Sequence, residues 1–142
     1  MVNKAVVQRK LKKLKEYLKE LATFEELTWE EYLENFQHRR TVERLIQLIV
    51  DTAVDINSHA VVDAGNPPPC DNFNSFIEAA KLGMFPLEFA RKIAPSTGER
   101  NIIVHEYEQI DDALVYNSIK EGLSMYRQYL EYLLDFVENY PE

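Results

Sequence analysis

Cysteine, glycine and proline are scarce in this 142-residue chain. The single cysteine, Cys70, excludes a disulfide within one chain and a thiolate metal cluster, and it suggests a reducing compartment. With four glycines and six prolines, the chain has few helix breakers and favours long helices over many short strands. No apolar stretch approaches the roughly 18 residues of a membrane span, and the N-terminus lacks the layout of a signal peptide. We therefore expect a cytoplasmic protein without a membrane partner, folded as a single domain over residues 1–142.

Basic residues are scarce relative to acidic ones everywhere except near the N-terminus. The net charge is −8, yet the first 19 residues carry seven Lys or Arg against Glu16 alone. An acidic protein is not an obvious nucleic-acid binder, because phosphate contacts supply most of that affinity, but a local basic stripe can still supply them. Two interpretations of the N-terminal lysines stay open: a solvated helix face, or a stripe that contacts nucleic acid.

Hydrophobic residues recur at helical spacing in three long segments, which end near residue 21, span about 29–62, and span about 112–137. The predicted core positions are Val7, Leu11, Leu14, Leu18 and Leu21, then Leu33, Phe36, Leu45, Ile49, Ala53, Ile56 and Ala60, and finally Leu114, Ile119, Met125, Leu130, Leu133 and Leu134. We predict an all-α fold, a helical bundle built around three long helices with short connecting helices.

Three Ser or Thr residues are each followed by Glu three positions later, which predicts capping boxes at Thr28 with Glu31, Ser75 with Glu78, and Ser96 with Glu99. The third box would make Ser96 the N-cap of a helix. Arg100 would then lie near the first turn, where backbone amides and the helix dipole favour an anion.

Arg100 and His105 could together cleave RNA without a metal ion. The guanidinium would stabilise the charged phosphate, and the imidazole would transfer a proton at the attacking 2′-hydroxyl or at the leaving oxygen. On a straight helix the two residues lie about 140° apart, whereas Arg100 and Tyr107 lie within about 20° of each other. Either the first turn is irregular, or two copies of the helix face each other across a dimer axis, and we favour the dimer.

The spacing Arg100, four residues, His105, one residue, Tyr107 resembles the R-x-x-x-x-H-x-Y motif of the HepT toxins, a branch of the HEPN ribonuclease superfamily. Residues 40–51, continuing to 59, and residues 82–86 resemble two flanking blocks of that family, so the similarity covers about residue 42 to the C-terminus. The resemblance implies a helical bundle, usually a homodimer, whose motif lines a cleft between protomers. It also implies a metal-independent endoribonuclease that leaves a 2′,3′-cyclic phosphate, with Arg100 and His105 catalytic and Asn101 in a supporting position.

The resemblance further implies a type VII toxin-antitoxin pair. The partner would be a small MNT-type nucleotidyltransferase antitoxin that transfers AMP from ATP to the motif tyrosine, here Tyr107, and so silences the nuclease. This chain itself would need no cofactor and no metal, and its substrate would be RNA, either tRNA or mRNA, and not DNA. The alternative is a non-catalytic subunit that binds a nucleotidyltransferase and accepts AMP, since the same motif serves both. Glu99 departs from the family average and would either pair with Arg100 or cap the helix.

Other polar and aromatic residues carry weaker indications. A polar row on the second long segment comprises Arg40, Arg44, Gln47, Asp51, Asp55 and Ser58. We expect no metal at Asp51 and Asp55, because no His stands beside them on that turn. His59 is interpreted as a structural residue or a groove residue, His38 as a surface residue and Cys70 as incidental. An aromatic run on the last segment is interpreted as core or dimer packing: Tyr126, Tyr129, Tyr132 and Phe136.

Overall fold

The computed structural model describes residues 1–105 and 110–141, with the backbone alone at 104 and 105. Its helices are α1 (Lys4–Ala22), α2 (Trp29–Glu34), α3 (Phe36–Asp63), α4 (Asn72–Lys81), α5 (Leu87–Ile93), α6 (Ser96–His105) and α7 (Asp112–Asn139). No strand occurs within these two ranges. The predicted all-α fold is confirmed, and the three long helices are α1, α3 and α7.

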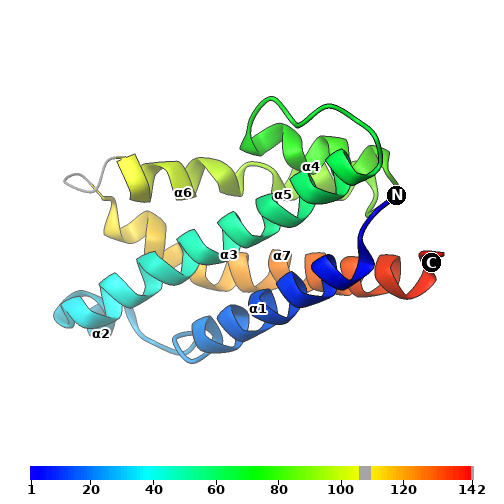
Figure 1. The fold of residues 1–142 in the computed structure, drawn as a ribbon. Coiled ribbons are helices and arrows are strands. Elements are labelled where there is room, and N and C mark those ends of the chain that lie inside the picture. The colour runs from blue at the N-terminus through cyan, green and yellow to red at the C-terminus, as the bar shows by residue number, and fades with distance from the viewer. Residues whose placement is uncertain (106–109, 142) are drawn as a thin grey trace.

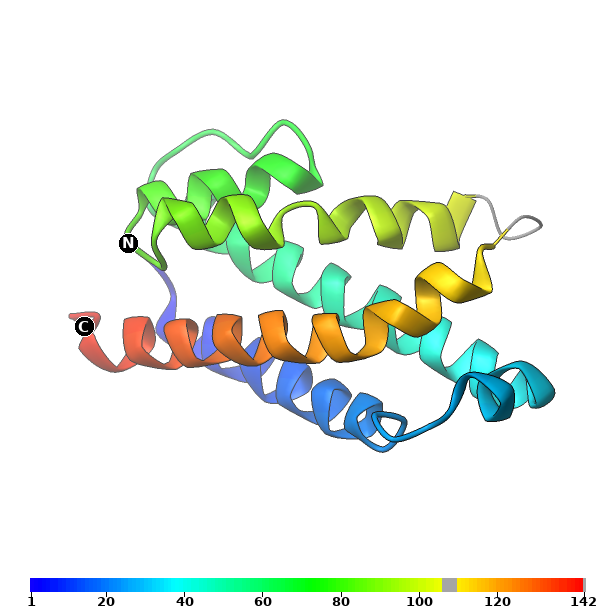
Figure 2. The same cartoon turned by 180° about the vertical axis from the view of Figure 1, so that it is seen from behind.

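The long helices pack together, the short helices α2, α4 and α6 pack against α3, and α5 packs against α4. Figure 1 shows α3 running between α1 on one side and α6 on the other, and both helices contact it. The view from behind shows α7 in front of α1 and α3, in contact with both (Figure 2). Helices α4 and α5 lie at the end of the bundle that holds both chain termini. Helix α6 extends from there toward the opposite end, where α2 lies.

The predicted capping box at Thr28 is confirmed, but the helix that it opens is short. The Glu31 amide donates to Thr28 Oγ1 at 3.2 Å, and the Thr28 amide donates to Glu31 Oε1 at 3.0 Å. Asn35 then adopts an extended backbone, and its side chain accepts hydrogen bonds from the amides of the next helix. The prediction of one continuous helix over residues 29–62 is therefore wrong at Asn35, which ends α2 and caps α3.

The other two predicted capping boxes are wrong. Asp71 caps α4, accepting from the Asn74 amide at 2.7 Å, while the Ser75 hydroxyl donates to the Asn72 carbonyl. Helix α6 begins at Ser96 itself, so Arg100 lies beyond the first turn. The Ser96 hydroxyl lies 2.6 Å from that of Tyr126, a buried contact between α6 and α7. In both cases the serine satisfies its hydrogen bond elsewhere.

The hydrophobic core follows the predicted pattern inside the helices and departs from it at their ends. All five predicted positions of α1 are buried, as are Ile49, Ala53 and Ile56 of α3. Leu33 and Phe36 are exposed, because they flank the break at Asn35, and Leu114 and Leu134 of α7 are exposed as well. On this point the core prediction is wrong for Leu33, Phe36, Leu114 and Leu134.

The aromatic run on α7 packs into the core. Tyr126 and Tyr129 are fully buried, and the Tyr129 hydroxyl donates to Asn57 Oδ1 at 2.7 Å. The half-buried Tyr132 packs against Phe89, with ring centroids 4.9 Å apart. The core interpretation of this run is confirmed for these tyrosines.

Helix α3 is long and apolar enough to cross a membrane by length and composition alone, with a mean hydropathy of 1.3 over an 18-residue window. Half of that window is buried inside the bundle, as in the central helix of a packed core.

Candidate functional site

The Arg100 guanidinium is held by the Asp51 carboxylate. Arg100 Nε donates to Asp51 Oδ1 at 2.6 Å, and Arg100 Nη2 lies 3.4 Å from Asp51 Oδ2. The two side chains come from α6 and α3, and they are 20% and 38% exposed. The pair is thus partly shielded from water but open on one side. Sequence reasoning placed Asp51 in a polar row and had no signal that would join it to Arg100.

Asn101 adds a weaker contact to the same guanidinium, since Arg100 Nη1 lies 3.4 Å from Asn101 Oδ1. Asp51 takes the Nε–Nη2 edge of the guanidinium. A second oxyanion would therefore meet the Nη1–Nη2 edge, which can also pair with two oxygens at once.

The other two predicted site residues fall at the end of the described part of α6. The helix is continuous from Ser96 to His105, so an irregular first turn does not explain how Arg100 and His105 could act together. The side chain of His105 lies outside the described residues, and so does Tyr107. Their predicted roles stay predictions.

Glu99 occupies an apolar environment behind Arg100. It lines a small cavity between α3, α6 and α7, together with Ser96, Ser118 and Tyr126. Burial raises the pKa of the Glu99 carboxyl, the hydrogen bond with Ser118 opposes the rise, and the charge of Glu121 adds to it. Arg100 pairs with Asp51 instead, and the helix begins at Ser96, so neither role expected for Glu99 is found.

Two other members of the polar row of α3, Arg40 and Asp55, form ion pairs. Arg40 contacts the buried Glu43 at 2.9 Å, and burial raises the pKa of Glu43 while Arg40 opposes the rise. Asp55 pairs with Lys10 of α1. Both acids considered for a metal site, Asp51 and Asp55, therefore have a cationic partner.

The other histidines and the cysteine lie away from Arg100. His59 is 3.7 Å from Asp63, at an exposed position, which agrees with the structural interpretation. His38 is half-buried with its ring edge-on to Phe24 at 5.5 Å, so its assignment to the surface is wrong in part. Cys70 is exposed.

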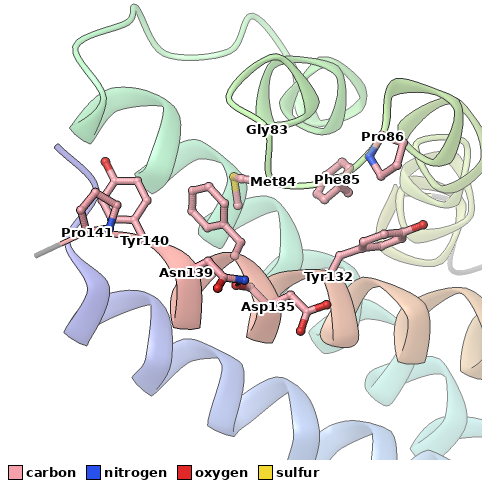
Figure 3. Close-up of a pocket in the computed structure, with 10 residues that line it drawn as sticks. Gly83, Met84, Phe85, Pro86, Tyr132, Asp135, Asn139, Tyr140 and Pro141 are labelled. Atoms are coloured by element: carbon pink, nitrogen blue, oxygen red, sulfur yellow. Dashed lines mark hydrogen bonds between the residues drawn. The ribbon is translucent and has the colours of Figure 1, made fainter.

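Two surface hollows differ in their relation to Arg100: its partner Asp51 lines one of them and not the other. Figure 3 shows a hollow between residues 83–86 and the C-terminal part of α7, where Tyr132, Asp135 and Asn139 line it. Its volume is about 550 Å³. Of the predicted site residues whose side chains the structure describes, neither Arg100 nor Asn101 lines it. A groove of about 510 Å³ between α1 and α3 is lined by Asp51, the partner of Arg100, and by basic residues of α1.

An all-helical bundle with an arginine, a histidine and a tyrosine at this spacing has the features of the HEPN class. The family model described as Ribonuclease HepT-like matches residues 8–133. The chain therefore belongs to the Ribonuclease HepT-like family.

Relatives and solved structures agree with this assignment. A protein of Aphanizomenon flos-aquae named tRNA nuclease HepT is 34% identical over 136 residues, which is 96% of this chain and 92% of the relative. A solved structure of a tri-AMPylated Shewanella oneidensis HEPN toxin in complex with MNT antitoxin has a TM-score of 0.81 at 18% identity, covering 95% of this chain and 99% of that one. The cytosolic protein YutE of Bacillus subtilis, described as of unknown function, has a TM-score of 0.79 at 14% identity, covering 96% and 92%. The structural likenesses establish the fold.

Proposed function

We propose that this chain is a metal-independent endoribonuclease, the toxin of a type VII toxin-antitoxin pair. Arg100 and His105 are its catalytic residues, and Asn101 supports Arg100. The relative named tRNA nuclease HepT, which is 34% identical over nearly the whole chain, supports an RNA substrate, tRNA in particular. The expected setting is the cytoplasm.

The observation that carries the proposal is the fixed guanidinium of Arg100. Long arginine side chains lose considerable conformational entropy when they are ordered, and Asp51 provides that order before any substrate binds. The Nη1–Nη2 edge can then pair with the two non-bridging oxygens of a phosphodiester. A positioned charge of this kind stabilises the dianionic phosphorane that forms during cleavage.

The reaction is an internal transfer that needs no external oxidant or metal. The ribose 2′-oxygen attacks the adjacent phosphorus, the bond from phosphorus to the 5′-oxygen breaks, and the products are a 2′,3′-cyclic phosphate and a 5′-hydroxyl. His105 takes the proton from the 2′-hydroxyl or gives one to the leaving 5′-oxygen. A homodimer that brings two copies of α6 together would supply one imidazole for each step.

Regulation would act on the same helix. An MNT-type nucleotidyltransferase partner would transfer AMP from ATP to Tyr107, with pyrophosphate as the leaving group. The added phosphate lies within reach of the Arg100 charge if the helical spacing continues to Tyr107. The Shewanella oneidensis HEPN toxin, described as tri-AMPylated and in complex with MNT antitoxin, supports this partner and this modification.

Incubation of the purified chain with total tRNA in EDTA tests the nuclease. We expect cleavage with 2′,3′-cyclic phosphate ends, and a loss of about 100-fold or more in Arg100→Ala and in His105→Ala. Arg91→Ala, which removes an exposed arginine of α5, is the matched control and should cleave normally. A wild-type chain that binds its nucleotidyltransferase but never cleaves RNA would instead support the non-catalytic subunit, and a requirement for Mg²⁺ would refute the mechanism.

A further inference from the structure

The groove between α1 and α3 gathers basic side chains next to the site of Arg100. Arg9, Lys10 and Lys13 of α1 line it, as does the half-buried Tyr17. Asp51 lines the same groove from α3 while it binds the Arg100 guanidinium. The basic part of α1 and the catalytic arginine are therefore connected through one side chain.

The charges in the groove leave an excess of positive charge. Arg100 offsets Asp51, and Lys10 offsets Asp55, the other acid of the lining. Arg9 and Lys13 are exposed, and within the described part of the chain the ion-pair partner of Lys13 is Glu16, at 3.6 Å. An exposed ion pair at that distance is weak, and a phosphate can replace it.

The position of these cations is informative because the rest of the chain is acidic, with a net charge of −8 overall. RNA approaching such a surface is repelled except where positive charge is concentrated. Among the basic residues of α1, Arg9, Lys10 and Lys13 line the groove against α3, whereas Lys12 and Lys15 line a separate hollow against α7.

We propose that the groove between α1 and α3 binds the phosphate backbone of the RNA substrate, with Arg9 and Lys13 as its contacts, and directs the strand to Arg100. This inference rests on the proposed nuclease function, because the ligand proposed for the groove is the RNA substrate. Tyr17 offers a ring on which a base can stack. The lysine-rich start of α1 then has a function as well as a solvated face.

Counterion release sets the expected size of the effect. For single-stranded nucleic acid each phosphate contact contributes about 0.7 to the slope of log affinity against log salt concentration, which is about 5-fold in affinity at 0.1 M salt. Loss of both contacts should weaken binding about 25-fold at that salt concentration and reduce the slope by about 1.4.

The test measures RNA binding separately from cleavage. Fluorescence anisotropy of a labelled single-stranded RNA oligonucleotide is recorded with His105→Ala protein, which is expected not to cleave it, over a range of salt concentrations. Arg9→Gln with Lys13→Gln should show the loss above, and Arg9→Lys with Lys13→Arg should retain the affinity. Lys12→Gln with Lys15→Gln removes the same charge from the other side of α1 and should stay within about 2-fold. Circular dichroism verifies that each variant is folded, which the exposure of all four residues favours.

The outcomes separate the groove from the nuclease. If both double variants lose the same RNA affinity, the effect is one of general charge and the proposal that the groove binds RNA is overturned. Unchanged RNA affinity in Arg9→Gln with Lys13→Gln would overturn it as well. A wild-type chain that binds RNA through Arg9 and Lys13 but does not cleave it would overturn the proposed nuclease and keep the groove. Loss of nucleotidyltransferase binding, with RNA affinity unchanged, would assign these residues to the protein partner and overturn the proposal.

Discussion

Replacing Asp51 by Asn removes the charge that holds the Arg100 guanidinium and keeps the size of the side chain. A hydrogen bond to a charged group contributes about 1.5–3 kcal/mol when it is buried, and an exposed ion pair contributes about 0.2–1 kcal/mol. The Asp51 side chain is 38% exposed, so solvent screening discounts the larger figure. We expect Asp51→Asn to lower the free energy of unfolding by about 1 kcal/mol, which lowers Tm by about 4 °C in a chain of this size.

The catalytic effect of Asp51→Asn should exceed its effect on stability. The guanidinium remains but is no longer oriented, and a misplacement of about 1 Å can cost up to about 100-fold in rate. We expect kcat at saturating RNA to fall about 10-fold, less than in Arg100→Ala. Because Asp51 also lines the basic groove, removing its negative charge should leave KM unchanged or lower it.

A double-mutant cycle measures the coupling directly. Asp51→Asn, Arg100→Ala and the double variant are compared by urea unfolding and by single-turnover cleavage. If Asp51 acts through Arg100, its replacement should have no further effect on cleavage once Arg100 is absent. Glu78→Gln, which breaks an exposed ion pair with Lys81 on α4, is the matched control and should change neither quantity appreciably. Unchanged kcat in Asp51→Asn would refute the positioning role, and so would a rise in KM that accounts for the whole loss.

Three further predictions follow from the site and its flanks. Tyr107→Phe should abolish the gain in mass that co-expression with the nucleotidyltransferase produces, and it should leave a nuclease that the partner no longer silences; modification that persists in Tyr107→Phe would show that AMP is attached elsewhere. Burial raises the pKa of Glu99, so between the unfolded and folded pKa values the folded chain binds more protons than the unfolded one, and stability falls as pH rises through that window. Burial raises the pKa of Glu43 as well, so Glu99→Gln should reduce this slope but not abolish it in urea midpoints measured across that window, above the ordinary pKa of 4.5; a slope unchanged by the substitution would exclude a contribution from Glu99. Light scattering should give the mass of a C2 homodimer at micromolar concentration, since α6 is continuous from Ser96 to His105 and residues five positions apart on a regular helix lie about 140° apart around its axis; a monomer there would contradict the shared cleft.

Regular periodicity was enough to predict the long helices, because burial of an amphipathic face depends on spacing within one segment. All five predicted positions of α1 are buried for this reason. Capping was predicted less well, because it depends on competition between neighbouring side chains. The Thr28 hydroxyl accepts the hydrogen bond that caps α2. At α4 the side chain of Asp71, four residues before Ser75, accepts this bond in place of the serine. Asn35 gave no signal strong enough to interrupt an apolar pattern that continues on both sides of it.

The partner of Arg100 could not be predicted at all. Asp51 stands 49 residues earlier in the chain and belongs to a polar row in which Arg40 pairs locally and Asp55 pairs with α1. Such a pair forms only when α6 packs on α3. The spacing of residues within one helix does not predict which other helix packs against it. The motif itself was readable, since Arg100, His105 and Tyr107 are near one another in sequence, but the group that orients Arg100 was not.

The distribution of charge and the position of Asp51 answer one question together: how an acidic chain could act on RNA. A positive surface over the whole protein would bind RNA anywhere, whereas a net charge of −8 with cations concentrated in α1 would restrict binding to one face. Helix α3 separates α1 from α6, so a strand held by Arg9 and Lys13 must pass over α3 to reach Arg100. Asp51 stands on that path and would repel a phosphate if it carried its charge alone. Its pairing with Arg100 both offsets this repulsion and orders the guanidinium. In the proposed function, the contact that prepares Arg100 for catalysis would therefore also open the groove to RNA.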